Sequence, residues 1–245
     1  MNAQYLIIGS GKTATHFSRY FSLLGLSFTC WNRQDSITAF KAQLQHSTHI
    51  ILAISDPAIE PFFNDNLQNY SGVSIHLSGS LNLPRVKACH PLMTFGATLY
   101  DLATYKSIPF VLDRNEDLAA LLPGLPNSFY TIDAKQRALY HALCVVGGNF
   151  TTLLWSEMSK GFASIGLPAE IAKPYLKQVL ENFLSVGVDS LTGPLARKDI
   201  QTVERNIEAL SGSSSGLADI YTAFAKAYLP QAKPNSNLAK IRRRA

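Results

Sequence analysis

A glycine-rich segment near the N-terminus is the first feature whose residue types could do chemistry. Residues 9–14 read GSGKTA, directly after an apolar run at 5–8 and directly before a stretch with helical apolar spacing. In a strand–turn–helix unit, Gly9 permits the tight turn, Gly11 lets the backbone approach a pyrophosphate, and Ala14 keeps helix and strand close. The helix N-terminus then offers backbone N–H groups to the anion. We therefore predict a dinucleotide site that includes Gly9, Ser10, Gly11, Lys12 and Thr13.

The same glycines admit a second interpretation, because Gly11, Lys12 and Thr13 also resemble the end of the phosphate-binding loop GxxxxGK[ST]. That motif requires a glycine where this sequence has Leu6, inside the expected strand. The loop is then too short to wrap a triphosphate, so the sequence favours a dinucleotide site over an NTPase site.

The residues after the second expected strand indicate which nicotinamide cofactor fits. An acid at this place binds the ribose 2′-hydroxyl of NAD, whereas an Arg accommodates the 2′-phosphate of NADP. Asn32 stands in place of the acid, Arg33 can make charge-assisted hydrogen bonds to phosphate, and the nearest carboxylate, Asp35, is expected beyond the strand tip. The sequence favours NADP(H), with Arg33 as a solvated turn residue as the alternative.

Polar residues also follow the third and fourth expected strands, where open α/β sheets bind their ligands. Ser55 and Asp56 follow the third strand and could line the ribose and nicotinamide side of the site. Asp56 could instead cap the helix that opens at Pro57, and the two roles are compatible. Ser78 follows the fourth strand and is expected near the substrate.

Histidine supplies the expected acid–base chemistry. His90 lies in the segment CHPLMTF, residues 89–95, which we expect to form a turn stiffened by Pro91 at the same sheet edge. An imidazole gives or takes a proton near neutral pH, as carbonyl or imine reduction requires. We predict a site role for His90, with a purely structural role as the alternative. His76 is expected to be a hydrogen-bonding residue at the end of its strand.

The second half of the chain carries further polar candidates. His141, Val145 and Asn149 recur every four residues, so the His and the Asn should project from neighbouring turns of one helix. Gly147 and Gly148 each weaken a helix by about 1 kcal/mol, which indicates either close approach of a ligand or tight helix packing. The catalytic candidates of the whole chain are Ser78, His90 and Asn149.

A loop at residues 191–199, LTGPLARKD, holds the remaining candidates. Arg197 could attract a substrate carboxylate or the cofactor phosphates, or it could form a structural ion pair with Asp199. The substrate-binding candidates are His141, Thr192, Gly193, Arg197 and Asp199. The chain has no CxxC motif, and no metal site is expected.

The elements that must position these residues follow from apolar periodicity. Strands are expected at 5–8, 27–31, 49–54, 73–77 and 108–112, and helices at 12–24, 134–161, 169–186, 199–210 and 217–228. The predicted fold class is α/β, with a Rossmann-like, doubly wound, mainly parallel sheet followed by an all-helical C-terminal domain. The expected domains are 1–132 for the cofactor, 133–228 for substrate binding and dimerisation, and a basic tail at 229–245.

Composition excludes several classes of protein. The 245 residues are 47% hydrophobic and 16% charged, which is typical of a globular chain and not of a disordered or coiled-coil one. The net charge of +5 arises from six cationic residues after position 225, so the body is near neutral and nucleic-acid binding is not favoured. Three widely spaced cysteines, without a signal peptide or an apolar span of roughly 18 residues, predict a cytoplasmic protein with no membrane segment.

Together these residues resemble a known group, NADP-dependent oxidoreductases with a Rossmann-like N-terminal domain and a helical C-terminal domain of unknown function, DUF2520. The pattern is carried by residues 9–14, 76–79 (HLSG), 90–92 (HPL) with Phe95, His141 with 149–150, and 191–194 (LTGP) with Arg197, Asp199, Thr202 and Val203. The resemblance implies kinship with pyrroline-carboxylate reductases and deazaflavin-dependent NADP oxidoreductases. It also implies a reduced nicotinamide cofactor and a helical domain that often forms a homodimer.

Three positions depart from related patterns. Lys198 stands where the group usually has Gly, and Asn206 stands where a His is common. The resemblance to β-hydroxyacid dehydrogenases stops at architecture, because Val145 replaces the Lys that precedes Asn149 by one helical turn in that class.

From these motifs together we expect an NADPH-dependent reductase that transfers hydride between nicotinamide and a small carbonyl or imine substrate in a cleft between its domains. The alternative is a non-catalytic NADP(H)-binding sensor or partner-binding protein, since fold alone does not establish turnover.

Overall fold

The computed structural model describes residues 3–212 and 216–229 of the chain. These residues form two compact units, one that ends at Phe150 and one that begins at Thr151. The predicted basic tail lies, from residue 230 on, outside the described residues, and the domain boundary predicted at residue 133 stays a prediction. No helix within the described ranges is long and apolar enough to cross a membrane.

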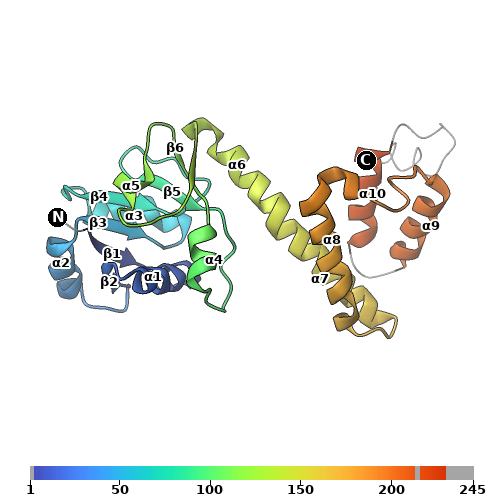
Figure 1. The fold of residues 1–245 in the computed structure, drawn as a ribbon, viewed down its shortest axis with the longest axis horizontal. Coiled ribbons are helices and arrows are strands. Elements are labelled where there is room, and N and C mark those ends of the chain that lie inside the picture. The colour runs from blue at the N-terminus through green and yellow to red at the C-terminus, as the bar shows by residue number, and fades with distance from the viewer. Residues whose placement is uncertain (1–2, 213–215, 230–245) are drawn as a thin grey trace. The chain divides into compact units, whose positions relative to one another are not determined.

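The first unit is built on one seven-stranded sheet (Figure 1). Its strands are β1 (Gln4–Ile8), β2 (Ser27–Trp31), β3 (His49–Leu52), β4 (Val73–His76), β5 (Lys87–Pro91), β6 (Phe110–Asp113) and β7 (Phe129–Ile132). They lie in the order β2-β1-β3-β4-β5-β6-β7, and every neighbouring pair is parallel except β5 and β6. The predicted α/β class with a Rossmann-like, mainly parallel sheet is confirmed.

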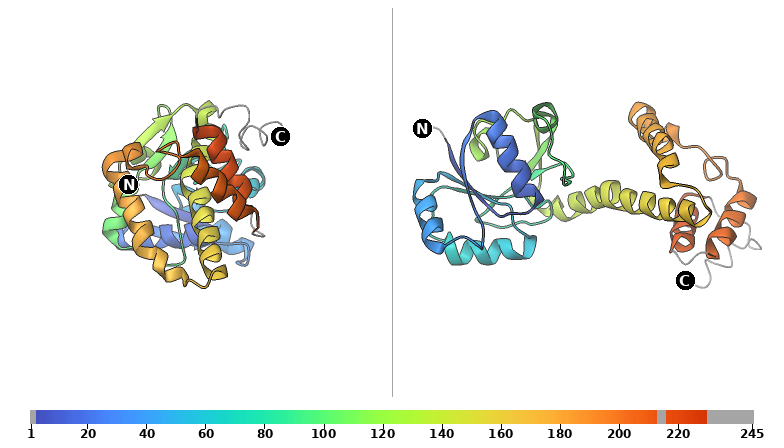
Figure 2. Two further views of the ribbon diagram at one scale, coloured as in Figure 1. Left: turned by 90° about the vertical axis from the view of Figure 1, so that its right-hand side faces the viewer. Right: turned by 90° about the horizontal axis from the view of Figure 1, so that it is seen from below.

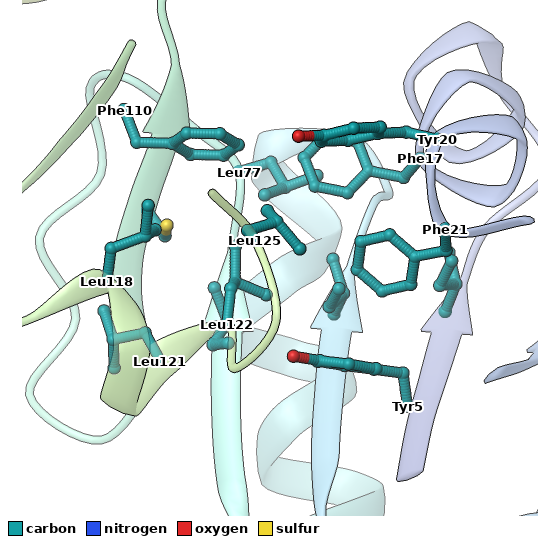
Figure 3. Packing of buried hydrophobic residues seen from close by; sticks show 14 of the residues in the cluster. Tyr5, Phe17, Tyr20, Phe21, Leu77, Phe110, Leu118, Leu121, Leu122 and Leu125 are labelled. Atoms are coloured by element: carbon teal, nitrogen blue, oxygen red, sulfur yellow. The ribbon is translucent and has the colours of Figure 1, made fainter. Parts of the chain in front are cut away.

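Alternation along the strands gives this sheet an apolar layer on each face. In β1, Tyr5 and Ile7 belong to one buried cluster, whereas Leu6 and Ile8 belong to the other. The first cluster includes α1 (Lys12–Leu24), α4 (Leu102–Ser107) and α5 (Leu118–Leu121), and the second includes α2 (Ile37–His46) and α3 (Asp56–Asn66). Figure 2 shows helices on both faces of the sheet. In Figure 3, Phe21 of α1 lies beside Tyr5, and Leu122 and Leu125, which follow α5, lie between these rings and the α5 residues Leu118 and Leu121.

The segment around His90 corrects one prediction. It forms strand β5 instead of a turn, and it pairs with β6 in antiparallel register, with His90 opposite Val111. Pro91 is tolerated because it is the last residue of the strand, where a missing N–H group costs little. Strand β7 was not predicted either, because its four residues are largely exposed and show no alternation of apolar and polar side chains.

After Ile132 the described chain contains helices and no strand. The elements are η1 (Ala134–Gln136), α6 (Arg137–Cys144), η2 (Val145–Phe150), α7 (Thr151–Ser164), η3 (Ala169–Ile171), α8 (Ala172–Val186), η4 (Gly187–Ser190), α9 (Ile200–Ser211) and α10 (Leu217–Tyr228). In the second unit, α9 and α10 bury Val203, Ile207, Ala225 and Leu229 as a small core. The predicted helical C-terminal region is confirmed, with a π-helical turn at η2 that periodicity did not indicate.

Candidate functional site

A pocket lies at the carboxyl ends of β1 and β3, where the chain leaves the sheet toward opposite faces. Its volume is about 570 Å³. Among the predicted cofactor residues, it is lined by Gly9, Ser10, Gly11, Lys12, Thr13, Asn32, Arg33 and Ser55. Ligands of doubly wound sheets bind at this switch point between strands. The structure therefore brings together eight residues that the sequence assigned to one site, and Asp56 is the one that it leaves out of the pocket lining.

The two glycines of the fingerprint have different local surroundings. Gly9 has a φ of +134°, and a Cβ atom there would lie 2.3 Å from the carbonyl oxygen of Ala53 in the neighbouring strand's extension. Only glycine fits this position without strain. At Gly11, by contrast, an added Cβ would meet nothing within 4 Å. Gly11 is the N-cap of α1 and has no capping side chain, so the first N–H groups of the helix face open space.

Asn32 and Arg33 lie at the other end of the pocket, after β2. The backbone N–H and the side-chain amide of Asn32 both donate to Asp35 Oδ2 at 2.8 Å. The Asp35 side chain thus folds back over the turn, and the Asn32 side chain helps to hold the backbone of the turn in place. Arg33 is exposed and forms no ion pair with any described residue. Its guanidinium is the cation left at this rim of the pocket for a ligand phosphate.

Asp56 links the pocket to a second group of polar residues. It lies in the first turn of α3, and its carboxylate accepts hydrogen bonds from Ser78 Oγ at 2.5 Å and Ser80 Oγ at 3.1 Å. The capping alternative for its side chain is not realised, because the N-cap residue is Ser55. Since Ser55 lines the pocket, Asp56 fixes the loop after β4 next to it.

His90 points from β5 toward this loop and toward α6. Its Nδ1 atom lies 2.6 Å from the hydroxyl of Tyr140. Burial, followed by electrostatic interaction with His141 and Arg137, lowers the pKa of His90 to about 4. Burial also raises the pKa of Tyr140 well above its usual range. At neutral pH the pair therefore consists of an uncharged imidazole and a protonated phenol.

Gly79 is the point at which His90 and His141 approach the same backbone. A Cβ atom on Gly79 would lie 2.8 Å from His141 Nδ1 and 3.1 Å from both His90 Nε2 and Cδ2. The ring centroids of the two histidines are 6.3 Å apart. Because any larger residue would displace one of the rings, the histidine pair requires glycine here.

A layer of buried polar groups lies behind the histidine pair. Arg137 is fully buried, and its Nε donates to Asp113 Oδ1 at 2.6 Å. Arg137 Nη1, His141 Nδ1 and both ring nitrogens of His76 are buried without a hydrogen-bond partner of normal geometry among the described residues. The hydrogen bond expected at this strand end reaches only the backbone of Ser78, and its geometry lies outside the normal range. Burial, followed by the charge of Arg137, lowers the pKa of His76 to about 4.

Two residues of this group escaped the sequence analysis. Tyr140 and Arg137 lie on α6, one and four residues before the predicted His141, but neither belongs to a recognisable spacing motif. The usable signal was Arg137 itself, a cation at the start of a predicted amphipathic helix in a segment that must pack on the sheet. A fully buried cation needs a partner of opposite charge. The sequence does not say which acid that is, so Asp113 could be found only from the fold.

The π-helical turn η2 corrects the expected spacing of His141 and Asn149. Hydrogen bonds in a π-helix join residues five apart, so side chains four apart no longer stack as in an α-helix. Asn149 is exposed, and no hydrogen bond among the described residues joins it to Ser78 or His90. Its catalytic assignment stays a prediction.

The remaining substrate candidates belong to the loop before α9 in the second unit. Asp199 caps α9 by accepting from the Thr202 backbone N–H at 3.1 Å, and the hydrogen bonds from Thr202 lower the pKa of this carboxyl. No ion pair joins Asp199 to Arg197 within the described residues, so that structural alternative is not realised. The loop also contains Gly193, with a φ of +93°, and Thr192, which is exposed.

Comparison with known families identifies the C-terminal region. Residues 113–228 match the family described as Domain of unknown function (DUF2520). This match covers a little under half of the chain. The DUF2520 segment begins at Asp113, the partner of Arg137, and ends in α10 at Tyr228. The predicted resemblance to the DUF2520 group is confirmed over this segment.

Several solved structures share the fold of this chain. The "putative NADP oxidoreductase BF3122" of Bacteroides fragilis is 17% identical, with a TM-score of 0.75 and coverage of 93% of this chain and 98% of that chain. Protein TM1727 from Thermotoga maritima is 21% identical, with a TM-score of 0.64 and coverage of 91% and 96%. Pyrroline carboxylate reductase of Plasmodium falciparum, solved with NADP bound, is 14% identical, with a TM-score of 0.58 and coverage of 93% and 99%. At such identities the likeness establishes the fold, and no curated protein matches the chain.

Proposed function

We propose that this protein is an NADPH-dependent reductase that acts on a small carbonyl or imine substrate. The observation that carries the proposal is the pocket of about 570 Å³, which gathers eight predicted cofactor residues at the switch point of the sheet. The NADP oxidoreductase and NADP-bound reductase named above support it by analogy of fold. When bound, the reduced nicotinamide supplies a hydride to the substrate carbon.

The residues of the pocket fit the parts of such a cofactor. The uncapped N-terminus of α1 offers backbone N–H groups to the pyrophosphate, and Gly11 leaves room for it. Ser10, Lys12 and Thr13 surround the same anion position. Arg33, free of internal ion pairs in the described chain, is suited to the 2′-phosphate that distinguishes NADPH from NADH.

The histidine group supplies polar chemistry next to this pocket. Asp56 ties the loop of Ser78 and Ser80 to the start of α3, beside the pocket residue Ser55. The same loop contains Gly79, on which His90 and His141 pack. We propose that the substrate's reacting group lies at Ser78, His90 and His141. For Thr192, Gly193 and Arg197, in the loop of the second unit, a role in substrate binding stays a prediction.

The proposal includes a homodimer and a cytoplasmic location. Helix α8 exposes Tyr175, Phe183 and Leu184 by 60%, 58% and 73%, and a second copy of the chain would cover such side chains. Cys30, Cys89 and Cys144 are all free thiols, which fits a reducing compartment.

Calorimetric titration with NADPH and NADH tests the cofactor assignment without knowledge of the substrate. NADPH is expected to bind at least about tenfold more tightly than NADH, which corresponds to about 1.4 kcal/mol. Arg33→Ala is expected to remove this preference because it removes the guanidinium for the 2′-phosphate. Lys41→Ala, which removes an exposed cation of α2 outside the pocket lining, is the matched control and should leave the preference unchanged. Failure of both nucleotides to bind the folded protein would overturn the proposed function.

A further inference from the structure

We infer, on the basis of the proposed function, that Tyr140 is a positioning residue that keeps the proton of a neutral His90 ring on Nε2. The site then presents a hydrogen-bond donor to the reacting atom. A carbonyl oxygen or the lone pair of a neutral imine nitrogen accepts from such a donor, whereas the protonated nitrogen of an iminium ion cannot. The inference therefore favours carbonyl compounds over imines that enter the site already protonated.

The first step concerns the direction of the hydrogen bond between Tyr140 and His90. The Tyr140 hydroxyl oxygen and His90 Nδ1 are 2.6 Å apart. This separation falls in the range of O–H donors, about 2.5–3.0 Å, and below the usual range of N–H···O bonds, about 2.7–3.2 Å. A phenol is also a stronger donor than a neutral imidazole N–H, and an imidazole nitrogen is a stronger acceptor than a phenol oxygen. The Cys144 sulfur, which also forms a hydrogen bond with Tyr140, is a weak acceptor, so Tyr140 donates its O–H to Nδ1.

The second step follows from the hydrogen-bond donor and acceptor that a neutral imidazole has. A neutral ring has one N–H and one lone-pair nitrogen. Since Nδ1 accepts from Tyr140, the proton of His90 must lie on Nε2. The ring stays neutral because burial, aided by electrostatic interaction with His141 and Arg137, lowers the pKa of His90 to about 4. The Tyr140 hydroxyl stays protonated because burial raises its pKa.

The third step concerns whether Nε2 of His90 is available for a hydrogen bond to a bound molecule. No described residue forms a hydrogen bond with this atom, and it is absent from the set of completely buried polar atoms without partners. Gly79 keeps the adjacent space clear, because its missing Cβ would lie 3.1 Å from Nε2. The N–H group is thus available to a bound molecule.

The charged and titratable groups that face His90 give an iminium ion no dedicated counter-ion. They are Asp56 from α3, Arg137 and His141 from α6, and His76 from β4. The Asp56 carboxylate already accepts hydrogen bonds from Ser78 and Ser80, and Asp113, the carboxylate beyond them, is paired with Arg137. Both His90 and Tyr140 lack a hydrogen bond to any described carboxylate. A cation would therefore meet N–H donors and a buried guanidinium, which disfavour it.

A carbonyl substrate gives a balanced reaction in this arrangement. The hydrogen and two electrons that carbon receives come from the NADPH of the proposed function, and negative charge develops on the carbonyl oxygen. The oxygen takes the Nε2 proton of His90, while the O–H proton of Tyr140 moves to Nδ1, so an alcohol forms and Tyr140 becomes a phenolate. This transfer is downhill because an alkoxide is a much stronger base than a phenolate. Water then returns a proton to Tyr140, and the Nε2–H tautomer of His90 is restored.

The tautomer of His90 can be measured without cofactor or substrate. In full-length protein labelled with ¹⁵N-histidine, long-range ¹H–¹⁵N spectra distinguish the two neutral tautomers, and His90→Gln assigns the signal. The Nε2–H form is expected to dominate from pH 6 to 8. Tyr140→Phe is expected to yield a mixture of tautomers, a change that loss of packing alone would not produce in a folded variant. A dominant Nδ1–H form in the unmodified protein would overturn the inference.

A matched pair of probes tests the substrate class. Cyclopentanone and 2-methyl-1-pyrroline have similar ring size, and the panel extends to larger ketones, aldehydes and cyclic imines. At pH 6, where the cyclic imine is protonated, NADPH oxidation is expected to give at least a tenfold higher kcat/KM for carbonyl compounds, and Gly79→Ala should lower it at least tenfold while NADPH still binds. Gly96→Ala, at a position where a Cβ meets nothing within 4 Å, is the control and should retain activity. Preference for the protonated imine at pH 6, or no turnover of any carbonyl by protein that binds NADPH, would overturn the inference but not the cofactor assignment.

Discussion

Arg137 and Asp113 form an ion pair of 2.6 Å in which the guanidinium side chain is 1% exposed and the carboxylate side chain 23% exposed. Asp113 ends β6, and Arg137 begins α6, the helix that carries Tyr140 and His141. Arg137 also reaches the carbonyl oxygen of Ala88 in β5 at 3.5 Å. The pair therefore anchors the helix of the histidine group to two strands of the sheet.

Removal of one partner of this ion pair should lower the free energy of unfolding by several kcal/mol. Asp113→Ala leaves the buried guanidinium without a counter-ion, and such changes typically cost about 3–5 kcal/mol. We expect urea unfolding to give a loss of about 3 kcal/mol, since Asp113 retains some exposure. Glu116→Ala breaks the more exposed pair of Lys87 and Glu116 and is the control, with an expected loss below about 1 kcal/mol. Equal losses in the two variants would show that the buried pair has no special role.

The two fingerprint glycines should respond differently to the same substitution. Gly9→Ala forces a Cβ to within 2.3 Å of the Ala53 carbonyl oxygen at a φ of +134°. The expected loss of unfolding free energy is about 2–3 kcal/mol, together with loss of NADPH binding.

Gly11→Ala is expected to leave stability within about 0.5 kcal/mol of the unmodified protein and to weaken NADPH binding at least tenfold, because the new methyl enters the space of the pyrophosphate. Thermal unfolding and calorimetry on both variants separate the two effects. Normal NADPH affinity in Gly11→Ala would remove this residue from the proposed site.

Much of this architecture could be predicted from local sequence patterns, and the limits have physical causes. Strands β1 to β4 are short apolar runs between turn signals, and the link from β1 through Gly9 to α1 has a dinucleotide fingerprint. Strand β5 carries Lys, His and Pro, so its pairing with β6 depends on tertiary contacts that the local sequence does not encode.

The pocket residues were predictable because they follow the ends of predicted strands. The contact between His90 and Tyr140 spans 50 residues, and it exists only because α6 packs against the sheet edge. The π-helical turn at η2 likewise escaped prediction, because residues 145–150 fit an α-helical pattern equally well.

The buried neutral state of His76 makes stability depend on pH. Its pKa in the folded protein is about 4, below the usual value of 6.5, so the unfolded chain binds more protons between these two values. The free energy of unfolding should therefore rise as pH increases from about 4 to 6.5 and then level off. The slope contributed by one such histidine is at most about 1.4 kcal/mol per pH unit.

Urea unfolding at several pH values measures this slope, and His76→Gln should reduce it. His46→Gln, which replaces a histidine in the last turn of α2 and outside the buried layer, is the matched control and should preserve the slope. A profile that is unchanged by His76→Gln would contradict the assignment of His76 as a source of this pH dependence.

Lys198 offers a test of the loop before α9. Its φ is +57°, a left-handed conformation that costs a non-glycine residue about 1–2 kcal/mol. Lys198→Gly removes this cost but adds chain entropy to the unfolded state, about 0.5–1 kcal/mol, so a net gain of about 0.5 kcal/mol is expected. Lys177→Gly, in the interior of α8, is the control and should lose about 1 kcal/mol. If Lys198→Gly were as destabilising as Lys177→Gly, the left-handed conformation of this loop would be wrong, and with it the placement of Arg197 and Asp199 on either side of Lys198.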